Sequence, residues 1–411
     1  MSKRGTPSGA PPELNVTRRS LLLGAGGVAV SAPAILPAQR RGSAPRVTVV
    51  GAGVFGSWTA EQLRRRGARV TLVDAWSPGH SRSSSGGESR MTRAGYGKDE
   101  IYARMALASL SEWQSLSRAS GLPILVPHGV LFFFQNDLSY LLASLDVHRR
   151  LGLPTESLDR SALAARFPMI AFDGVQGGMF EPRFGALMAR RAIQTLVHRF
   201  LGAGGQFEQR RIDGTGDYPA ADRIVLALGP WLPKLFPRLL GQRIVATRQE
   251  VFTFVPPAGD PWFTPARMPG WADFNNGDVF YGFPDLEGKG VKFAHDAHGA
   301  VVDPQTQDRR FTDKALAEVV AFRDRRFPRL RNAQLATAEV CQYENSSNGD
   351  FLIAPHPDEP RIILVGGGSG HGFKHGPEVG RMAAELTLDG KQPDPRFNLA
   401  SKGTVQKREV I

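Results

Sequence analysis

The chain has 411 residues, 41% of them hydrophobic, so it can bury a large core, and two domains are the usual organisation at this length. Its formal charge is +12, but the 41 arginines and 10 lysines are scattered without a long basic run, which argues against a nucleic-acid partner and favours an anionic substrate or cofactor. The single cysteine, Cys341, excludes a disulfide framework and a cysteine-rich zinc site, and leaves either an inert buried thiol or a reactive one.

The first forty residues predict an export signal. A twin arginine, Arg18 and Arg19, precedes an apolar stretch diluted by Gly and Ala, and the small-residue sequence APA follows at 32–34. The apolar stretch at 21–36 is short for a membrane span. We expect residues 1–38 to be a leader for the twin-arginine translocase, which would deliver the folded, cofactor-loaded protein to the periplasm. An uncleaved leader that anchors the protein in the envelope is the alternative.

Residues 46–76 predict a βαβ unit. An apolar strand at 47–50 leads into the sequence GAGVFG, a helix runs to about Arg66, and a second strand ends at Asp74. The turn supplies three glycines, Gly51, Gly53 and Gly56. Glycine lets the backbone approach a pyrophosphate at a helix N-terminus, and the acid can accept a hydrogen bond from a ribose hydroxyl. The pattern predicts dinucleotide binding, without separating NAD from FAD.

The remaining segments predict an α/β fold. We expect helices at 99–120 and 186–201, buried strands of a parallel sheet at 221–231 and 360–372, and antiparallel strands in QEVFTFVPP, GDVFYGFP and GVKFAH. The outline is a Rossmann-like cofactor-binding domain built from separated segments, interrupted by a β-rich substrate domain. We assign the first domain to 45–124, 172–236 and 340–400, and the second to 125–171 and 237–339.

Three separated stretches carry a resemblance to a known family. These are the Ser/Gly-rich segment at 80–100, which leads into two arginines three apart, the sequence YGFPDLEGKGVKFAH at 281–295, and the segment at 341–380 from Cys341 to GHGFKHGPEVG. In this order they resemble the monomeric sarcosine oxidase and N-methyltryptophan oxidase family, within the D-amino-acid oxidase-like superfamily. The similarity runs from about residue 46 to 397. It implies an FAD enzyme, and an NAD dehydrogenase would not call for the cysteine segment.

The resemblance implies roles for individual residues. Cys341 would join FAD through a thioether, a reaction that a neighbouring cation favours. Lys292 would promote electron transfer to O2, and Arg93 and Lys374 would hold the substrate carboxylate. Arg90 would lie near the flavin face and Tyr281 in the substrate pocket wall. The cofactor-binding residues would be Gly51, Gly53, Gly56, Asp74, Cys341, Gly370, His371 and Gly372.

A glycine loop and a helix beginning near Pro377 would aim backbone N–H groups at the flavin edge where negative charge gathers on reduction. His371 and His375 are four positions apart, but a glycine loop offers no helical face to align them, so we expect no metal site.

The chain departs from the family pattern near the substrate. Four positions after Lys292 the sarcosine oxidases have a histidine, whereas this chain has Asp296, with His295 and His298 on either side. A shift of one residue could restore a histidine, although the sequence that follows keeps register without a gap. The stretch at 208–223 also looks shorter than the usual hairpin. These changes leave the identity of the substrate open.

The function expected from the resemblance is oxidation of the C–N bond of a small, N-alkylated amino acid to an imine, with O2 reduced to hydrogen peroxide. One alternative is a dehydrogenase of the same fold that passes electrons to a quinone or cytochrome. Another is a non-catalytic exported flavin-binding protein, which the Asp296 departure would favour.

Overall fold

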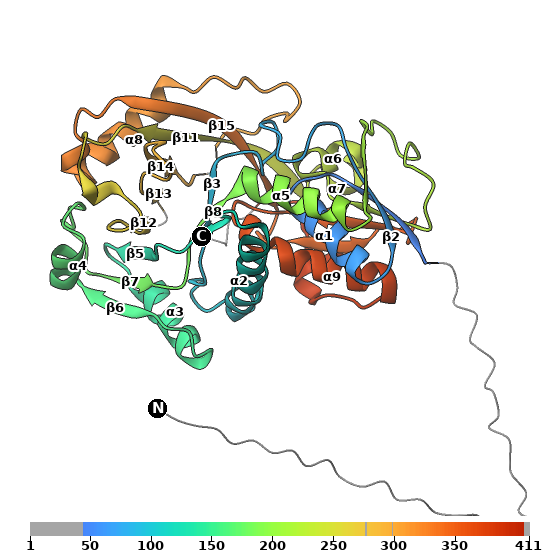
Figure 1. The fold of residues 1–411 in the computed structure, drawn as a ribbon, viewed down its shortest axis with the longest axis horizontal. Helices are drawn as coiled ribbons and strands as arrows, with labels where there is room; N and C mark the ends of the chain where they lie inside the picture. The colour runs from blue at the N-terminus through green and yellow to red at the C-terminus, as the bar shows by residue number, and fades with distance from the viewer. Residues whose placement is uncertain (1–43, 276–277, 298, 407–411) are drawn as a thin grey trace, which may run out of the picture. The chain divides into compact units, whose positions relative to one another are not determined.

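The computed structural model describes residues 44–275, 278–297 and 299–406, so the predicted leader lies outside the described residues. Three sheets and their helices make up this part of the chain, and the predicted α/β fold is confirmed (Figure 1). No described helix is long and apolar enough to span a membrane.

A six-stranded sheet contains the predicted βαβ unit. Its strands, in spatial order, are β16 (Leu352–Pro355), β17 (Ile362–Gly366), β10 (Arg223–Leu226), β1 (Arg46–Val50), β2 (Arg69–Asp74) and β9 (Gln206–Gln209). All neighbours are parallel except β16 and β17, which pair antiparallel. The central strands are apolar and buried, as expected for a parallel sheet covered on both faces. The sheet brings together segments more than 300 positions apart in sequence, because only β10 lies between β1 and β17.

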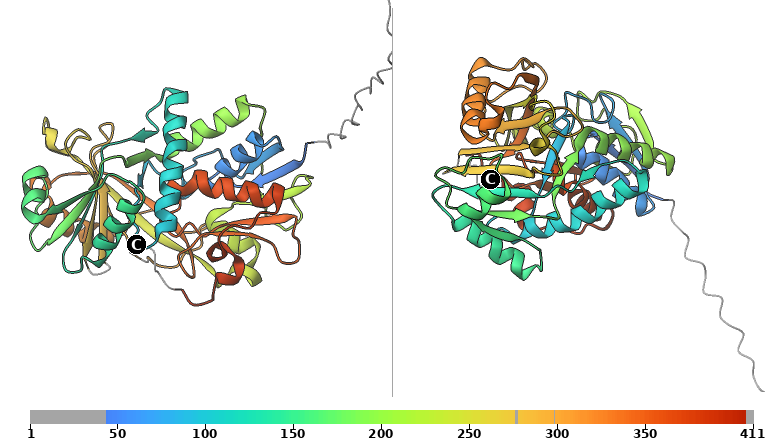
Figure 2. Two further views of the ribbon diagram at one scale, coloured as in Figure 1. Left: turned by 90° about the horizontal axis from the view of Figure 1, so that it is seen from below. Right: turned by 60° about the vertical axis from the view of Figure 1, so that its left-hand side comes forward.

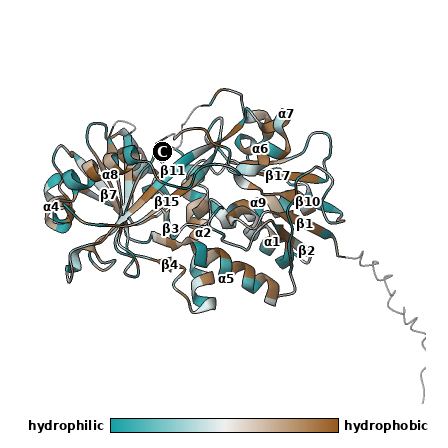
Figure 3. Ribbon diagram, turned by 90° about the horizontal axis from the view of Figure 1, so that it is seen from above, coloured by the Kyte–Doolittle hydropathy of each residue, from teal (hydrophilic) through white to brown (hydrophobic). Residues whose placement is uncertain are grey.

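The helices of this region are α1 (Val54–Arg65), α2 (Glu100–Ser120), α5 (Ala189–Gly202), α6 (Leu232–Leu235), α7 (Pro237–Leu240) and α9 (Gly376–Asp389). The helix α1 packs on α9, and Gly380 allows the close approach, since a Cβ there would lie 2.6 Å from the backbone of Trp58. Figure 2 shows α2 crossing α9. In Figure 3, α5 carries apolar and polar residues in alternation along its length, the pattern of a helix with one buried face.

The predicted start of α5 was three residues too early. Residues 186–188 belong instead to β8 (Gly185–Met188), which pairs with β3 (Ser89–Thr92) and β4 (Leu125–Val126) in a three-stranded sheet. The fully buried run GALM has no polar position to mark the change from strand to helix.

An eight-stranded sheet makes up the β-rich region. Its strands, in spatial order, are β15 (Leu335–Ser346), β11 (Ile244–Phe254), β14 (Val291–His295), β13 (Asp278–Phe283), β12 (Gly270–Asn275), β5 (Val130–Phe134), β7 (Gly177–Glu181) and β6 (Glu156–Asp159). All pairs are antiparallel except β5 and β12. The strand β7 lies inside a range assigned above to cofactor binding, yet it pairs in this sheet. The domain boundaries stay a prediction.

The two faces of the eight-stranded sheet have different partners. One face buries Trp271, Phe280 and Phe293 against α8 (Asp313–Arg326). The hydrophobic core on this face also includes a residue of α4 (Arg160–Arg166). The other face carries Phe132 and Ala272, which belong to the same core as β1 and α1, and α3 (Ser139–Arg150) also contributes to that core. This second face therefore points toward the six-stranded sheet.

Strand register places three predicted site residues on that second face. Residues directly opposite one another in neighbouring strands share a face, and so do residues two apart along one strand. Ala294 lies opposite both Val251 and Tyr281, and Val251 lies opposite Glu339. Cys341 and Lys292 lie two residues from Glu339 and Ala294. Cys341, Lys292 and Tyr281 therefore face the six-stranded sheet together, from three strands.

Candidate active site

A cavity of about 300 Å³ lies at the carboxyl ends of β1, β2 and β10. This is where open parallel sheets bind ligands, and the volume is at the lower end of the range of about 300–1,000 Å³ for small-molecule sites. Seven of the predicted residues line it: Gly51, Gly53, Asp74, Arg90, Cys341, Gly370 and Gly372. The cavity thus joins the glycine turn near residue 50 to the C-terminal segment.

Each of the three glycines of the first turn has a different structural role. Gly51 has φ +107°, and a Cβ there would lie 2.2 Å from the Ala227 carbonyl oxygen. A Cβ on Gly56 would lie 1.8 Å from the Gly51 carbonyl oxygen, so Gly56 serves the packing of helix on turn and does not line the cavity. A Cβ on Gly53 would meet only the Ser85 hydroxyl, at 3.5 Å, and would project into the cavity wall at the start of α1. That open backbone fits a pyrophosphate.

Asp74 is held at the end of β2 by backbone donors. The Ala52 and Trp76 amides donate to its two carboxylate oxygens at 2.6 and 2.8 Å. Burial raises the pKa of Asp74 in spite of these hydrogen bonds. Each carboxylate oxygen keeps a further lone pair, so the side chain can still accept from a ribose hydroxyl at the cavity wall.

The loop after β17 supplies the opposite wall. Gly370 has φ +79°, and a Cβ there would lie 2.8 Å from the Tyr343 ring, so this close approach requires glycine. Ser369 has φ +45°, which is unusual for a residue with a side chain; its hydroxyl accepts from the Ser346 amide at 3.1 Å and donates to the Gly367 carbonyl oxygen. The loop is thus fastened to the end of β15.

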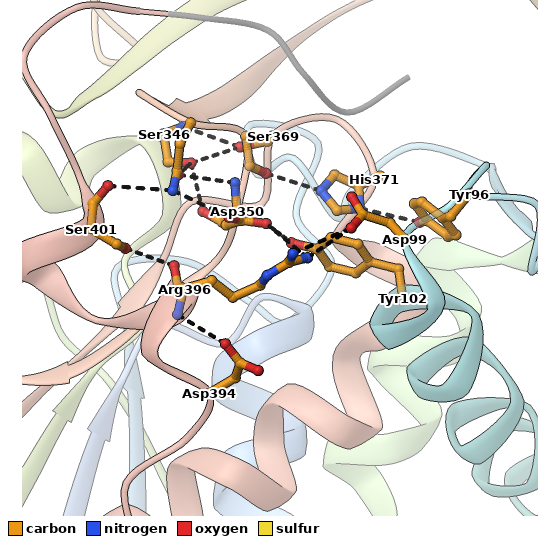
Figure 4. Close-up of polar contacts among 12 residues, drawn as sticks. Tyr96, Asp99, Tyr102, Ser346, Asp350, Ser369, His371, Asp394, Arg396 and Ser401 are labelled. Carbon is orange, nitrogen blue, oxygen red and sulfur yellow. Dashed lines mark hydrogen bonds and ion pairs between the residues drawn. The ribbon is translucent and has the colours of Figure 1, made fainter. Parts of the chain in front are cut away.

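A network of polar contacts among neighbouring residues holds this loop in place (Figure 4). Tyr102 on α2 donates to Asp350 at 2.6 Å, and Arg396 lies 3.8 Å from Asp350 and 3.2 Å from Asp99. The Tyr96 hydroxyl lies 3.1 Å from Nδ1 of His371. His371 itself is not among the cavity-lining residues, and its role here is to connect the loop to Tyr96.

Arg90 lies beside the Cys341 thiol and affects the pKa of Lys292. Its guanidinium lies 3.7 Å from the sulfur of Cys341 and donates to the Ser84 carbonyl oxygen at 2.6 Å. Lys292 donates to the Ser89 carbonyl oxygen at 3.0 Å and lies 5.9 Å from the centre of the Tyr281 ring. Burial and then the Arg90 charge lower the pKa of Lys292 to about 7. A buried cation pair of this kind attracts a developing negative charge.

Arg93 and Lys374 meet at one aromatic ring. The guanidinium carbon of Arg93 lies 4.1 Å from the centre of the Tyr96 ring, and the Lys374 ammonium lies 5.2 Å from the same centre. Lys374 also donates to the His371 carbonyl oxygen at 2.8 Å. Burial and the Arg93 charge lower the pKa of Lys374 well below its ordinary value. An anion between the two would restore the ammonium form, as expected for a carboxylate site.

Tyr281 faces Tyr343 across the same surface, with hydroxyl oxygens 3.5 Å apart. Burial and the negative charge of Asp296 raise the pKa of Tyr281, so its phenol stays protonated and can donate a hydrogen bond.

The structure decides between the neighbouring candidates at 295 and 296. The His295 ring stacks on Phe280 at 4.3 Å, and its nitrogens lie 2.5 Å from Asp278 and 3.4 Å from Glu318 of α8. His295 therefore points to the α8 face, and Asp296 occupies the face of Lys292 and Tyr281. His298 lies outside the described residues.

His371 and His375 come closer together than the sequence suggested. A 3₁₀ turn at Phe373–His375 and the Tyr96 hydroxyl, 2.8 Å from Nε2 of His375, bring the two rings to 5.8 Å. Among residues 44–275, 278–297 and 299–406, no three His, Cys, Asp or Glu side chains are grouped to hold a metal.

Sequence reasoning missed four residues. Tyr96 has both Arg93 and Lys374 beside its ring, and Ser85 accepts from the first amide of α1 at 3.0 Å. Ser369 fastens the glycine loop, and Glu344 lines the cavity, where burial raises its pKa to about 7. The Ser-rich run 83–85, which follows the end of β2 at Asp74 within the same loop, was a usable signal for Ser85. Tyr96, in the sequence RAGYGKDE, and Glu344, in CQYENSS, carried no comparable signal.

The chain is similar to known FAD-dependent oxidoreductases over most of its length. A family model described as FAD dependent oxidoreductase matches residues 46–386. The monomeric sarcosine oxidase of Streptomyces avermitilis is 31% identical over 367 residues, covering 85% of this chain and 95% of that protein. The N-methyl-L-tryptophan oxidase of Salmonella arizonae is 30% identical over 371 residues, covering 85% and 96%.

Solved structures share the fold at lower identity. The L-proline dehydrogenase from P. horikoshii superposes with a TM-score of 0.74 at 19% identity, covering 87% of this chain and 97% of that one. NikD, an unusual amino acid oxidase essential for nikkomycin biosynthesis, gives a TM-score of 0.71 at 19% identity, covering 85% and 95%. By its family match and its curated relatives, the chain belongs to the family of FAD-dependent oxidoreductases.

Proposed function

We propose that this protein oxidises the C–N bond of a small, N-alkylated amino acid to an imine, which water then hydrolyses. One observation carries the proposal: Arg93 and Lys374 converge on the Tyr96 ring, while Tyr281 and Lys292 share a sheet face with Cys341, which lines the cavity. A carboxylate site beside a flavin cavity suits an amino acid substrate. The curated relatives named for sarcosine and N-methyl-L-tryptophan support the secondary amine.

FAD, when bound, supplies the redox chemistry by taking two electrons from the C–N bond and passing them to O2, which leaves as hydrogen peroxide. The open backbone at Gly53 and the α1 N-terminus would hold the pyrophosphate, and Asp74 the adenosine ribose. Gly370 and Gly372 line the cavity and would lie against the flavin edge, while the backbone N–H groups of His371 and Gly372 donate to the Gly368 carbonyl oxygen within the loop.

Cys341 is proposed to hold the flavin covalently through a thioether. Its sulfur lies in the cavity wall beside Arg90, and the positive guanidinium would stabilise the thiolate that has to react. Among the described residues the thiol has no disulfide partner, which leaves it available.

In the substrate site, Arg93 and Lys374 would orient the carboxylate and Tyr281 would donate a hydrogen bond near the amine. Lys292 would place a positive charge where electrons reach O2. This use of Lys292 favours an oxidase over a dehydrogenase of the same fold.

Export through the twin-arginine translocase to the periplasm, with residues 1–38 as leader, is proposed from Arg18, Arg19 and the apolar stretch that follows. Replacing both arginines by lysine should keep a tagged protein in the cytoplasm of a bacterial host. A periplasmic location of that variant would contradict this part of the proposal.

The experiment that tests the function is an aerobic screen of the purified flavoprotein against primary, N-methyl and cyclic amino acids. The readouts are oxygen uptake and peroxide formation. Butyrate, which has the size of sarcosine and the charge of its neutral-amine form but no amine, serves as the blank. Peroxide formed in proportion to an N-alkylated amino acid supports the proposal. Amine oxidation without oxygen uptake, seen only with an added quinone, would identify the dehydrogenase.

A further inference from the structure

Asp296 lies in the substrate region by strand register. It follows β14, and its amide donates to the Val279 carbonyl oxygen of β13 at 2.7 Å. Asp296 is two residues beyond Ala294, which lies opposite Tyr281, so its side chain extends the row that Lys292 begins. One carboxylate oxygen of Asp296 is buried. The neighbouring His295 is committed to the other face by Phe280 and Asp278.

The negative charge of Asp296 acts on the residues proposed to bind the substrate. Burial lowers the pKa of Arg93, and Asp296 is among the groups whose negative charge outweighs that effect and raises it. Asp296 also opposes the lowering of the pKa of Lys374 by burial and by Arg93. It is the first charged group, after burial, that raises the pKa of Tyr281. Strand register and these effects on the pKa values together place the Asp296 carboxylate near Arg93, Lys374 and Tyr281.

Glu181 supplies a second carboxylate to Arg93. It is fully buried, accepts from the Ala94 amide at 3.0 Å and lies 3.6 Å from His148. Arg93 and Lys374 thus have two carboxyl groups, those of Glu181 and Asp296, near them before any substrate binds.

A simple N-alkyl amino acid would add a further negative charge to this site. Its amine has to be neutral to give up electrons, so the reactive form carries only the negative carboxylate. With that carboxylate bound at Arg93 and Lys374, a second negative charge would lie near Asp296. A substrate with a second, positively charged group would offset the repulsion between its carboxylate and Asp296, and Asp296 is placed to receive it.

From this arrangement, and resting on the proposed function, we infer that Asp296 is a specificity-determining residue, which makes the protein select N-alkylated amino acids whose side chain carries a positive charge. The substrate class is an N-alkyl diamino acid, with its carboxylate at Arg93 and Lys374 and its distal ammonium at Asp296.

The test uses the flavin-loaded protein and two substrates, the Nα-methyl derivatives of ornithine and norleucine, which differ by an ammonium in place of a methyl group. Anaerobic loss of the flavin absorption band gives the rate and dissociation constant for each. Wild type should prefer the ornithine derivative by about tenfold or more. The variant Asp296→Asn should lose most of that preference, and Asp296→His should do the same.

The matched control is Asp278→Asn, which removes the same charge from the opposite face and should keep the wild-type preference. A second readout needs no turnover: butyrate and γ-butyrobetaine, which differ by a quaternary ammonium and are not oxidised as secondary amines, are titrated by their perturbation of the flavin spectrum. Wild type should bind γ-butyrobetaine more tightly, and Asp296→Asn should not.

The outcomes separate the inference from the proposed function. Equal rates and equal affinities for the charged and neutral partners in wild type, or an unchanged preference in Asp296→Asn, would overturn the role of Asp296 while amine oxidation stands. If no amine bleaches the flavin, the proposed function fails, and the ligand titration still decides on Asp296. If Asp296→Asn does not fold, the wild-type preference decides.

Discussion

The guanidinium of Arg90 lies 3.7 Å from the sulfur of Cys341, although 251 positions separate the two residues. The contact joins the segment after β2 to the middle of β15, and both residues line the cofactor cavity. Lys292 lies close enough for Arg90 to lower its pKa. The proposed flavin link and the proposed oxygen site therefore share one cation, and separate variants are needed to distinguish their contributions.

Replacing Cys341 by Ser should leave FAD bound but release it on denaturation, because the glycine turn and Asp74 would still hold the nucleotide while the thioether is absent. The measurement is acid precipitation followed by absorbance of pellet and supernatant. Wild type should keep its flavin in the pellet, and Cys341→Ser should release nearly all of it. Free FAD added to the denatured variant controls for trapping. Complete release from wild type would rule out the covalent link.

Replacing Lys292 by Met should slow the reaction with oxygen by about 10²–10³, the usual cost of losing one preorganised charge, while anaerobic bleaching by substrate persists. The wild-type rate with oxygen should fall as pH rises through about 7, because the ammonium loses its proton there. Lys292→Met should show a slow, flat profile. Stopped-flow mixing of the reduced protein with oxygen gives both rates.

Two further variants make the assignment to Lys292 specific. Lys292→Arg keeps the charge at all these pH values and should give a profile without the fall. Arg90→Gln removes a cation that lowers the pKa of Lys292, so the fall should move to higher pH. An unchanged oxygen rate in Lys292→Met would remove the basis for preferring an oxidase.

Binding of a carboxylate should drive proton uptake at Lys374. Burial and Arg93 lower its pKa well below the ordinary value, so above the folded-state pKa the amine is neutral until an anion favours the ammonium. Calorimetry of butyrate binding in two buffers of different ionisation enthalpy measures the protons taken up. Lys374→Met should bind more weakly, by about tenfold, and take up none. Uptake that survives in Lys374→Met would place the proton elsewhere.

Substitution of two glycines of the first turn, Gly53 and Gly56, should affect the protein in different ways. Gly53→Ala meets only the Ser85 hydroxyl at 3.5 Å, so the protein should fold, with a cost of about 1 kcal/mol or less, yet hold no FAD because the methyl group occupies the pyrophosphate approach. Gly56→Ala would place a Cβ 1.8 Å from the Gly51 oxygen and should cost roughly 3 kcal/mol or more. Flavin content and urea unfolding of the flavin-free forms distinguish them. Normal flavin content in Gly53→Ala would exclude this site for the pyrophosphate.

The elements around the cofactor could be predicted because their signals are local. The strand at 47–50, the helix α1 and the end of β2 at Asp74 follow from apolar periodicity and from glycines at fixed spacing. The start of α5 was wrong because Gly185–Met188 is buried on all sides, and a fully apolar run does not reveal its period. The pairing of β7 with β5 was missed because strand order depends on contacts distant in sequence.

The residues of the site could be predicted only where they belong to a sequence motif. Cys341, Lys292 and Tyr281 came from the family resemblance, and the register of β15, β14 and β13 explains why they share a face. Tyr96 was not predictable, because its role depends on Arg93 and Lys374 converging from segments about 280 positions apart. The choice between His295 and Asp296 also needed the structure, since adjacent residues of a strand point to opposite faces.

The most direct test of the account is an anaerobic titration of the purified flavoprotein with N-methyl amino acids, with and without a positive side chain, against butyrate as the unreactive carboxylate. The account predicts that at least one N-methyl amino acid abolishes the flavin absorption band, that admitting oxygen restores it with an equivalent of hydrogen peroxide, and that butyrate only perturbs it. A fully loaded protein whose absorption band is unchanged by every amine would contradict the central claim that this chain oxidises N-alkylated amino acids.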